Sequence, residues 1–378
     1  MGPLSGIKIV ELAGIGPGPM AAMMLADMGA TVLRVERAEP SGLGVQRPLN
    51  CDITLRSRNA IALNLKDPEH RDRVLRLVEE ADVLIEGFRP GVTERLGLGP
   101  DDCFTRNDKL VYGRMTGFGQ DGPMAQAAGH DLNYIAMSGA LSAIGRADQP
   151  PTPPLNLVGD YGGGALYLVV GVLAALLETR GSGKGQVVDA AMVDGAANLM
   201  AAPFGMFAAG LLTKTRGANV LDSGSYFYDS YECADGKYVS VAAIEPKFHA
   251  EMLELMELDP LIVTKQMDRS DWPRLKKIMV DRFLTKTRDE WVMIMGGSDA
   301  CFAPVLEMDE VADDPHNKAR GTFIEIDGIV QPAPAPRFSR TPNPAPTAPV
   351  RAGMVSLDDA LAGWLPADEI ATWSAASL

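Results

Sequence analysis

Residues 7–36, IKIVELAGIGPGPMAAMMLADMGATVLRVE, determine the fold. Two apolar runs rich in β-branched residues, Ile7–Leu12 and Ala30–Glu36, predict buried strands, and Met20–Met28 between them predicts a helix. A strand, a helix and a second strand in this order predict a parallel pair with a right-handed crossover. The pattern indicates an α/β fold built on a Rossmann-like sheet.

The turn after the first strand contains part of a dinucleotide-binding fingerprint. Gly14 and Gly16 match the first two glycines of G-x-G-x-x-G, but Pro19 occupies the third position. Glu36 stands where such sites bind a ribose hydroxyl. We interpret the segment as a Gly/Pro turn that joins strand to helix, and a nicotinamide or flavin site is the alternative.

The alternation of strands and helices continues beyond this unit. Further strands are predicted at residues 61–66, 82–86, 110–115 and 186–190, and helices at residues 67–81, 92–96, 132–141, 161–180 and 193–212. From residue 225 the composition changes, because two runs around Asp235-Gly236 predict a β-hairpin. Helices at residues 246–258, 272–283 and 289–295, a strand at 323–326, an extended proline-rich segment at 331–350 and a helix at 358–365 follow. A second, smaller α+β domain is therefore expected.

Length and charge narrow the class of protein. The chain has 378 residues, of which 46 % are hydrophobic, and a formal net charge of −14. The length favours two domains with sizeable cores. The negative charge argues against a general affinity for nucleic acid or anionic membranes. The longest apolar run, residues 165–177, contains a glycine and is too short for a membrane span.

Cysteine usage and the two ends of the chain bear on location. The four cysteines are scattered, so neither a disulfide framework nor a zinc site is predicted, and no other metal site is expected: Cys51, Cys103, Cys233 and Cys301. The start lacks a basic region followed by an apolar one, so no secretory signal is predicted. A cytoplasmic protein is expected. The final residues, Ala376-Ser377-Leu378, resemble a peroxisomal signal, which is the alternative.

Four cations stand at or just past the ends of predicted strands and loops: Arg37, Lys66, Arg89 and Arg95. The planar fork of an arginine suits phosphate oxygens, so the four can form one rim for a phosphorylated small molecule. Each can equally be a solvated surface charge. The residues alone favour the second interpretation.

Two short motifs carry the candidate chemistry: Gly129-His130-Asp131, and residues 159–164, GDYGGG. Histidine is the side chain suited to act as a base near neutral pH. If His130 and Asp160 flank a carbon next to a carbonyl, they can move a proton from one face to the other through an enolate. Backbone N–H groups of the helix expected after Asp160 can receive the enolate oxygen.

These residues also have simpler interpretations. Asp160 can be a plain N-cap, and a helix N-terminus favours the ionised carboxylate over the acid. His130 can be a turn histidine bonded to backbone. Glu245 can be an N-cap or a carboxylate that orients an imidazole. The other histidines have no comparable setting and are interpreted as structural: His70, His249 and His316.

On these residues, the chain resembles the family III CoA-transferase superfamily, and within it the branch of the α-methylacyl-CoA racemases. The resemblance extends over almost the whole chain. It is carried by residues 2–37, by EGFRPGVTERLGLGP (86–100), RMTGFGQDGP (114–123), AGHDLNYIAMSGAL (128–141), PPLNLVGDYGGG (153–164), GKGQVVDAAMVDG (183–195), YECADGKYV (231–239) and parts of residues 303–323. The resemblance implies an isomerase that interconverts (2R)- and (2S)-2-methylacyl-CoA thioesters, without metal or redox cofactor, since CoA is part of the substrate.

The resemblance also implies an architecture. We expect a large Rossmann-like CoA-binding domain in residues 1–195, a linker in 196–224, a small domain in 225–322, and a C-terminal segment, 323–378, that returns to the large domain. Two chains are expected to interlock as a homodimer with the active site between subunits. Glu245 can then reach the site from either subunit.

The resemblance assigns roles to individual residues. His130 and Asp160 are the expected acid/base pair, and Glu245 is the expected partner of His130. The expected CoA contacts are Arg37, Leu63, Asn64, Leu65, Lys66, Gly87, Phe88, Arg89, Arg95, Gly129, Asp131, Leu132, Asn133 and Tyr134. The family commonly has Asp where Asn64 stands. The four scattered cations thus become one phosphate site.

Two other functions compete with the racemase. A CoA-transferase would use Asp160 as a nucleophile that forms a mixed anhydride, but these enzymes usually carry a non-basic residue where His130 stands. A non-catalytic CoA-binding protein would not need all three acid/base positions.

The identity of the acyl chain stays open, between a branched fatty acid, a sterol side chain and a bile-acid precursor. Methionines can offer an acyl tail a pliable surface or simply pack in the core: Met20, Met23, Met24, Met192, Met200 and Met206.

Overall fold

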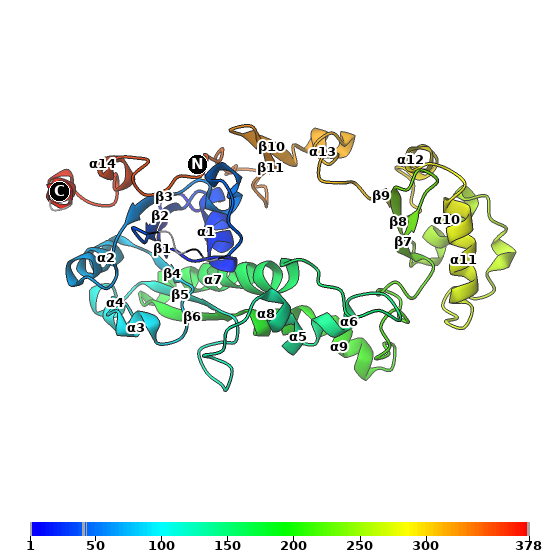
Figure 1. The fold of residues 1–378 in the computed structure, drawn as a ribbon, viewed down its shortest axis with the longest axis horizontal. Helices are drawn as coiled ribbons and strands as arrows, with labels where there is room; N and C mark the ends of the chain where they lie inside the picture. The colour runs from blue at the N-terminus through cyan, green and yellow to red at the C-terminus, as the bar shows by residue number, and fades with distance from the viewer. Residues whose placement is uncertain (1, 40–41, 43, 376–378) are drawn as a thin grey trace. The chain divides into compact units, whose positions relative to one another are not determined.

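The structure is a computed structural model that describes residues 2–39, 42 and 44–375 (Figure 1). The chain forms two compact units. The first comprises Met1–Ser138, Leu155–Leu199 and Gly321–Leu378, and the second comprises Gly139–Pro154 and Met200–Arg320. The domain boundaries expected from the sequence stay a prediction, and residues 376–378, which resemble a peroxisomal signal, lie outside the described residues.

The first unit is built on a six-stranded sheet in the order β3-β2-β1-β4-β5-β6. Its strands are β1 (Lys8–Leu12), β2 (Thr31–Glu36), β3 (Asn59–Ala62), β4 (Val83–Glu86), β5 (Val111–Thr116) and β6 (Gln186–Ala191), and every neighbouring pair is parallel. The register sets Glu11 beside Arg34 and Glu86 beside Arg114. The predicted parallel α/β fold is confirmed.

Helices cover both faces of this sheet, because alternate residues of its strands are apolar on both sides. On one face lie α1 (Pro17–Asp27) and α7 (Leu166–Ser182), whose Leu25 and Val172 are fully buried. On the other face lie α2 (Pro68–Glu80), α4 (Pro100–Arg106), and the short helices α14 (Leu357–Ala360) and α15 (Ala367–Ala375). The result is a three-layer α/β/α unit (Figure 1).

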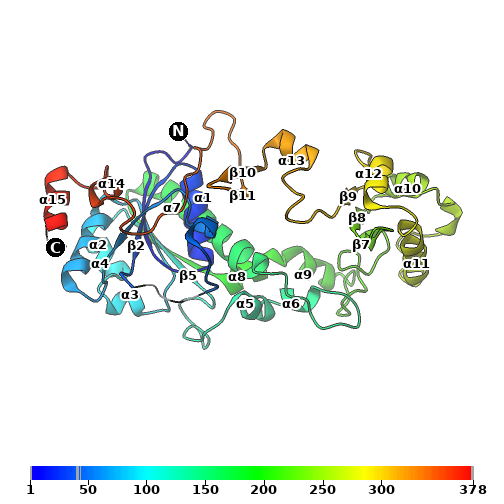
Figure 2. The same ribbon diagram turned by 45° about the horizontal axis from the view of Figure 1, so that its top comes forward.

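The end of the chain packs on the first unit. Figure 2 shows α15 beside α2, where Arg76 of α2 bonds the Glu369 carboxylate at 3.0 Å and the Arg73 guanidinium stacks on the Trp373 ring. Two buried arginines also hold the preceding extended segment. Arg34 donates to the Val350 carbonyl at 2.9 Å, and Arg56 donates to the Gln331 amide oxygen at 3.0 Å.

The first unit contains further short elements. They are α3 (Val92–Arg95), α5 (Asp131–Met137), α8 (Met192–Leu199), the 3₁₀ turns η1 (Leu49–Cys51) and η2 (Ile53–Leu55), and the hairpin of β10 (Phe323–Ile326) and β11 (Ile329–Pro332). A π-helix, η3 (Leu157–Ala165), runs directly into α7.

The helix predicted at residues 161–180 therefore begins earlier than expected, and its first part is a π-helix. The glycines of this part answer a packing need. A Cβ on Gly163 would lie 2.6 Å from the Ala196 backbone nitrogen, and one on Gly195 would lie 1.9 Å from the Gly163 carbonyl oxygen. The backbones of η3 and α8 thus touch, and no side chain fits between them.

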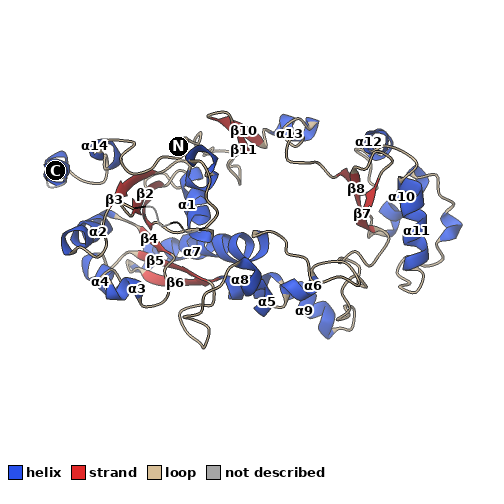
Figure 3. Cartoon of the chain, viewed as in Figure 1, coloured by secondary structure: helices blue, strands red, loops and turns tan. Residues whose placement is uncertain are grey.

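The second unit is smaller and combines an antiparallel sheet with helices (Figure 3). The sheet order is β7-β8-β9, with strands Tyr228–Glu232, Tyr238–Ala242 and Phe302–Pro304. The helices are α6 (Ala140–Ala143), α9 (Ala201–Ala208), α10 (Pro246–Leu255), η4 (Pro260–Ile262), α11 (Trp272–Phe283), α12 (Arg288–Met295) and α13 (Pro315–Arg320). Its aromatic core includes Phe227, Phe283 and Trp291. The predicted hairpin and three helices are confirmed.

Several predicted elements need correction. The strand expected at 61–66 is β3, Asn59–Ala62, and Leu63–Lys66 is a turn in which Asn64 accepts the Lys66 N–H. The helix expected at 193–212 is two helices, α8 and α9, which meet at Met200. The closing helix is only α14, and the helices α4, α13 and α15 were not predicted.

One stretch of described residues, Leu157–Ser182, is long and apolar enough to meet the criteria for a membrane span. Core helices meet the same criteria. Leu168 and Val172 of this stretch are buried against the sheet, so it offers only weak support for a span.

Candidate functional site

His130 lies at the N-cap of α5, in extended backbone, and its side chain is exposed. The main-chain N–H of His130 donates to the Asn133 amide oxygen at 3.1 Å, while the imidazole makes no capping hydrogen bond. The backbone contacts that fix this turn thus leave the imidazole available to a ligand.

Asp160 lies inside η3, three residues after its first residue, and is half-buried. Asn156, not Asp160, occupies the N-cap, and its side-chain amide donates to Asp160 Oδ2 at 3.3 Å. The N-cap interpretation of Asp160 is therefore wrong, because the helix begins before this residue.

One carboxylate joins the two motifs. Asp131 Oδ2 accepts the backbone N–H of Gly159 at 2.6 Å and that of Asp160 at 2.7 Å. These two N–H groups lie near the start of η3 and are bonded to Asp131. The N–H groups that were expected to receive an enolate oxygen follow Asp160 in the chain, and that role stays a prediction.

The surroundings of Asp160 raise the pKa of its carboxyl above the ordinary value for an aspartate. Burial raises the pKa of the Asp160 carboxyl, and the charge of Asp131 raises it further. The hydrogen bond from Asn156 and the charge of His130 lower this pKa, but the net direction is upward. The charge of His130 thus acts on the Asp160 carboxyl, and the roles of the two residues as acid and base stay a prediction.

The Gly/Pro turn after β1 forms one wall of this site. Gly16 has a left-handed backbone, with φ of +70°, and a Cβ at this position would lie 3.3 Å from Asp160 Oδ2. Pro17 begins α1 and packs against Gly164 of η3. The turn that resembles a dinucleotide fingerprint is thus in contact with the Asp160 carboxylate.

Tyr134 stabilises the turn that contains His130. Its ring lies edge-on to Phe118, with centroids 5.0 Å apart, and its hydroxyl donates to the Gly129 carbonyl. A Cβ on Gly117 would lie 2.1 Å from the ring. Burial raises the pKa of Tyr134 to about 12, so this hydroxyl stays protonated at neutral pH and acts as a fixed donor.

A pocket of 220 Å³ gathers cations from three segments of the first unit. Lys66 and Arg95 line it, as expected for a phosphate rim, together with Arg71 of α2. The rest of the lining is Leu65, Asp67, Pro68 and Leu96. Arg71 was missed because it lies inside a predicted helix, whereas the candidate cations were sought at the ends of strands and loops.

The other expected CoA residues lie in this unit too. Arg37 and Arg89 are exposed, and the charge of Arg89 acts on Tyr134. Leu63 is only 4 % exposed, so its backbone rather than its side chain is available to a ligand. His70, interpreted as structural, accepts the Asn64 N–H through Nδ1 at 3.0 Å.

A buried ion network holds the loop that contains Gly87, Phe88 and Arg89. Glu86 accepts the Phe88 N–H at 2.7 Å and pairs with Arg114 Nε at 3.0 Å. Arg114 also pairs with Glu94 of α3, at 2.9 Å, and α3 contains Arg95. Burial, partly opposed by the Phe88 N–H and Arg114, raises the pKa of Glu86 to about 7.

Glu245 belongs to the second unit. It occupies the N-cap of α10 and is exposed, and its carboxylate makes no capping hydrogen bond. Its side chain is therefore not used by the helix, and its expected pairing with His130 stays a prediction.

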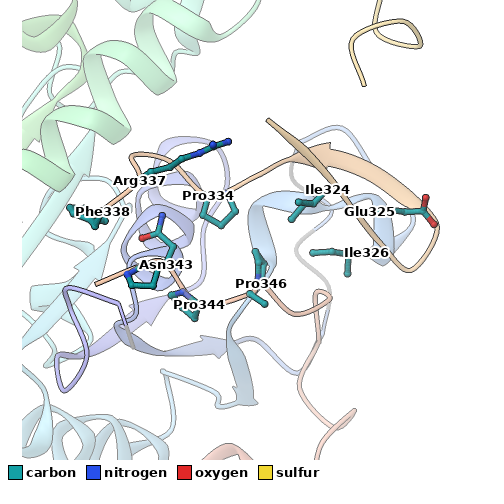
Figure 4. Close-up of a pocket in the computed structure, with 11 residues that line it drawn as sticks. Ile324, Glu325, Ile326, Pro334, Arg337, Phe338, Asn343, Pro344 and Pro346 are labelled. Atoms are coloured by element: carbon teal, nitrogen blue, oxygen red, sulfur yellow. The ribbon is translucent and has the colours of Figure 1, made fainter. Parts of the chain in front are cut away.

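A larger cavity, of 630 Å³, lies elsewhere in the first unit, between β10 and the extended residues 334–346 (Figure 4). It is lined by Ile324, Glu325, Ile326, Pro334, Arg337, Phe338, Pro342, Asn343, Pro344, Ala345 and Pro346. No expected catalytic or CoA residue contributes to it. Among the described residues, no cluster of three or more potential metal ligands is found.

The methionines have mixed environments. Met23 and Met192 are buried. Met20 and Met24 pack partly buried against the core, and Met200 and Met206 are half-buried. Core packing therefore accounts for Met23 and Met192.

The chain is similar to known proteins over most of its length. The chain is 44 % identical to α-methylacyl-CoA racemase of Mus musculus over 341 residues, which cover 90 % of this chain and 87 % of the mouse protein. It is 43 % identical to α-methylacyl-CoA racemase of Homo sapiens, again over 90 % of this chain and 87 % of the relative.

A crystal structure of a CAIB/BAIF family protein from Brucella suis superposes with a TM-score of 0.77 at 27 % identity. The match covers 93 % of this chain and 96 % of that protein. The family model described as CoA-transferase family III matches residues 4–353. The chain therefore belongs to the CoA-transferase family III.

Proposed function

We propose that this protein is a racemase of 2-methylacyl-CoA thioesters, an isomerase that inverts the carbon next to the thioester carbonyl. The observation that carries the proposal is the relationship of His130 to Asp160. Asp131, the residue after His130, accepts the backbone N–H of Asp160, and the charge of His130 acts on the Asp160 carboxyl. The identity to racemases of the family, 44 % over 90 % of the chain, favours this function over CoA transfer.

The mechanism is a proton transfer across one carbon. The Asp160 carboxylate removes the proton from one face of the α-carbon, and the C–H electron pair moves into an enolate. The His130 imidazolium then donates its proton to the opposite face, and the C–H bond forms again with inverted configuration. In the other direction, neutral His130 removes the proton and protonated Asp160 returns one. No electron is lost or gained.

The raised pKa of Asp160 serves this cycle, since the carboxyl must hold a proton in one of the two directions. A carboxyl buried beside another carboxylate retains its proton to higher pH. Acid and base of more similar proton affinity exchange roles with little cost in free energy.

The CoA portion is proposed to bind along the strand ends. Lys66, Arg71 and Arg95 surround a pocket that is large enough for a phosphate group. The loop of Gly87, Phe88 and Arg89 is held from inside by Glu86. The reaction requires no cofactor besides the CoA that the substrate contains.

We further propose a cytoplasmic homodimer whose active site lies between subunits. The four cysteines are free, as is usual in a reducing compartment. Along α7, Leu166, Val170 and Leu177 are 45 %, 65 % and 68 % exposed, which gives an apolar face suited to a second copy. Glu245 of either subunit is proposed to orient His130. The acyl chain stays undefined beyond its 2-methyl group.

The test uses one epimer of a 2-methylacyl-CoA in D₂O, with no added acid acceptor. We expect inversion with deuterium uptake at the α-carbon, and loss of inversion in both His130→Ala and Asp160→Ala. If CoA moves only when a second carboxylic acid is supplied, with no inversion and no exchange, the protein is a transferase and Asp160 is its nucleophile.

A further inference from the structure

Asp131 follows His130 directly and is 5 % exposed. Its Oδ2 accepts two backbone N–H groups, those of Gly159 and Asp160, at 2.6 and 2.7 Å. One side chain therefore spans from the first turn of α5 to the first turns of η3. The backbone that holds the imidazole and the backbone that holds the Asp160 carboxyl are fixed to each other by this contact.

The contact is close enough to dictate the neighbouring residue. A Cβ on Gly159 would lie 2.7 Å from Asp131 Oδ2 and 3.1 Å from the Asp131 Cα. Only glycine admits the carboxylate at this distance. Asp131 thus requires a glycine at position 159, the first residue of the GDYGGG motif.

The second oxygen of Asp131 has no hydrogen-bond partner among the described residues, although it is buried. A carboxylate that served only as a helix cap could leave its second oxygen hydrated at no cost in free energy. Here its charge stays next to Asp160 with little screening. N–H groups at the start of a helix ordinarily stabilise a nearby anion, but these two are already bonded to Asp131.

We propose that Asp131 is a positioning residue for the proton transfer: it fixes Asp160 relative to the His130 turn, and its charge keeps a proton on Asp160 in one half of the cycle. This inference rests on the proposed racemase function. It explains how a carboxyl at the start of a helix can act as an acid.

The groups that face Asp160 are few. From α5 and the turn before it come Asp131, His130 and the neutral hydroxyl of Tyr134, and from the start of η3 comes the Asn156 amide. Helices α1 and α8 pack against η3 through Pro17, Gly163 and Gly164 contacts, and no titratable group of theirs among the described residues acts on Asp160.

The matched variants are Asp131→Asn and Asp131→Glu. Asparagine keeps an oxygen that can accept the two N–H groups but removes the charge, whereas glutamate keeps the charge and displaces it. The acid limb of the kcat/KM profile reports the proton-transfer pair in the free enzyme. We expect this limb to shift to lower pH by about one unit in Asp131→Asn. In Asp131→Glu it should stay in place while kcat falls.

A second measurement does not depend on catalysis. The carboxyl carbon of Asp160 is followed by NMR against pH in the full-length protein labelled with ¹³C-aspartate, and assigned by its loss in Asp160→Asn. We expect Asp160 to titrate above an ordinary aspartate in the wild type, and lower in Asp131→Asn.

Three outcomes overturn the inference. One is an acid limb that does not move in a folded, active Asp131→Asn. Another is an Asp160 resonance whose titration is the same in both proteins. The third, which needs no variant, is a wild-type Asp160 that titrates at or below an ordinary aspartate. If Asp160 titrates as expected but no epimer is inverted, the proposed function fails and the role of Asp131 in setting the Asp160 charge stands.

Discussion

The carboxylate of Asp131 accepts the backbone N–H of Asp160 at 2.7 Å, across 29 positions of sequence. Between them, residues 139–154 belong to the second unit and the chain then returns to the first. The two motifs of the proposed site are therefore joined by a partly buried hydrogen bond rather than by adjacency in the chain. A hydrogen bond to a charged group is worth roughly 1.5–3 kcal/mol.

The two bases should be separable by proton exchange. In His130→Ala, Asp160 can still remove and return a proton on its own face, so one epimer should exchange its α-hydrogen in D₂O without inverting. In Asp160→Ala the other epimer should do so. Inversion should fall by roughly 10²–10⁴-fold in both variants. Mass spectrometry with chiral separation measures both quantities. Exchange in the same epimer for both variants would contradict the assignment of faces.

Glu86 should make stability depend on pH. Burial raises its pKa from 4.5 to about 7 in the folded protein. A raised acid pKa gives stability that is full below the unfolded value and is lost as pH rises through the folded one. The loss in the free energy of unfolding between about pH 4.5 and 7 is at most about 3 kcal/mol. Urea unfolding of the wild type and Glu86→Gln measures it, and the difference between the two should shrink or reverse across this range.

Glu94 provides the control for Glu86, because Arg114 contacts both. Hydrogen bonding and the charge of Arg114 lower the pKa of Glu94 despite some burial. The contribution of Glu94 to the free energy of unfolding is therefore present above the unfolded pKa and is lost as pH falls. The difference in stability between wild type and Glu94→Gln should thus change with pH in the direction opposite to that for Glu86→Gln. Equal slopes for the two variants would mean that neither reports its own titration.

Gly195 should not tolerate a methyl group. A Cβ there would lie 1.9 Å from the Gly163 carbonyl oxygen, so Gly195→Ala must push α8 away from η3. We expect a loss of about 3 kcal/mol in the free energy of unfolding, measured by urea denaturation, and reduced activity. Gly181→Ala is the control, since a Cβ there meets nothing within 4 Å in α7. It should gain about 0.5–1 kcal/mol. Similar effects at both positions would exclude the backbone contact as the cause.

Arg71 should contribute to CoA affinity. Because Arg71 lines the cationic pocket and pairs only with a neighbouring exposed Asp72 among the ion pairs of the described residues, Arg71→Ala should raise KM about tenfold and leave kcat nearly unchanged. Arg106→Ala, at an exposed arginine of α4, is the control. With a 3′-dephospho-CoA thioester, the increase in KM caused by Arg71→Ala disappears if Arg71 binds the 3′-phosphate. It persists if Arg71 binds the diphosphate. An unchanged KM for both thioesters would remove Arg71 from the site.

The exposed face of α7 should mediate dimerisation. Val170 is 65 % exposed, and a charge there would be buried without a partner if a second copy covers it. Val170→Glu should therefore shift the protein to monomers in light scattering coupled to size exclusion. Val45→Glu, at a position 85 % exposed outside this helix, should stay dimeric. A Val170→Glu protein that remains a dimer would place the interface elsewhere.

Local patterns predicted the sheet well. The strands at residues 7–12 and 30–36 were recognisable because apolar periodicity and turn residues act over a few positions, and the structure has them as β1 and β2. Two of the helices that were missed had local signals too. Pro100 with Asp101 and Asp102 begins α4, and Asp368 and Glu369 lie in the first turn of α15.

The site itself depended on contacts that sequence patterns do not contain. His130 and Asp160 were identified as candidates, but Asp160 was expected to start a helix. Whether a carboxylate caps a helix depends on which residue begins it, and here the start was set by Asp131, from another helix. The glycines of η3 are needed because another backbone lies against them, and only the structure identifies α8 as that neighbour.

The arginines that hold the end of the chain set an order of assembly during synthesis. Arg34 is made 316 residues before its partner Val350, and Arg56 is made 275 residues before its partner Gln331. Until then, each guanidinium lacks one of its final partners. The second unit, complete at residue 320, has all its residues before the first does. The first unit therefore begins to be translated before the second unit and is completed after it. A nascent chain stalled after residue 320 presents a Rossmann-like sheet that still lacks its C-terminal segment to chaperones and proteases.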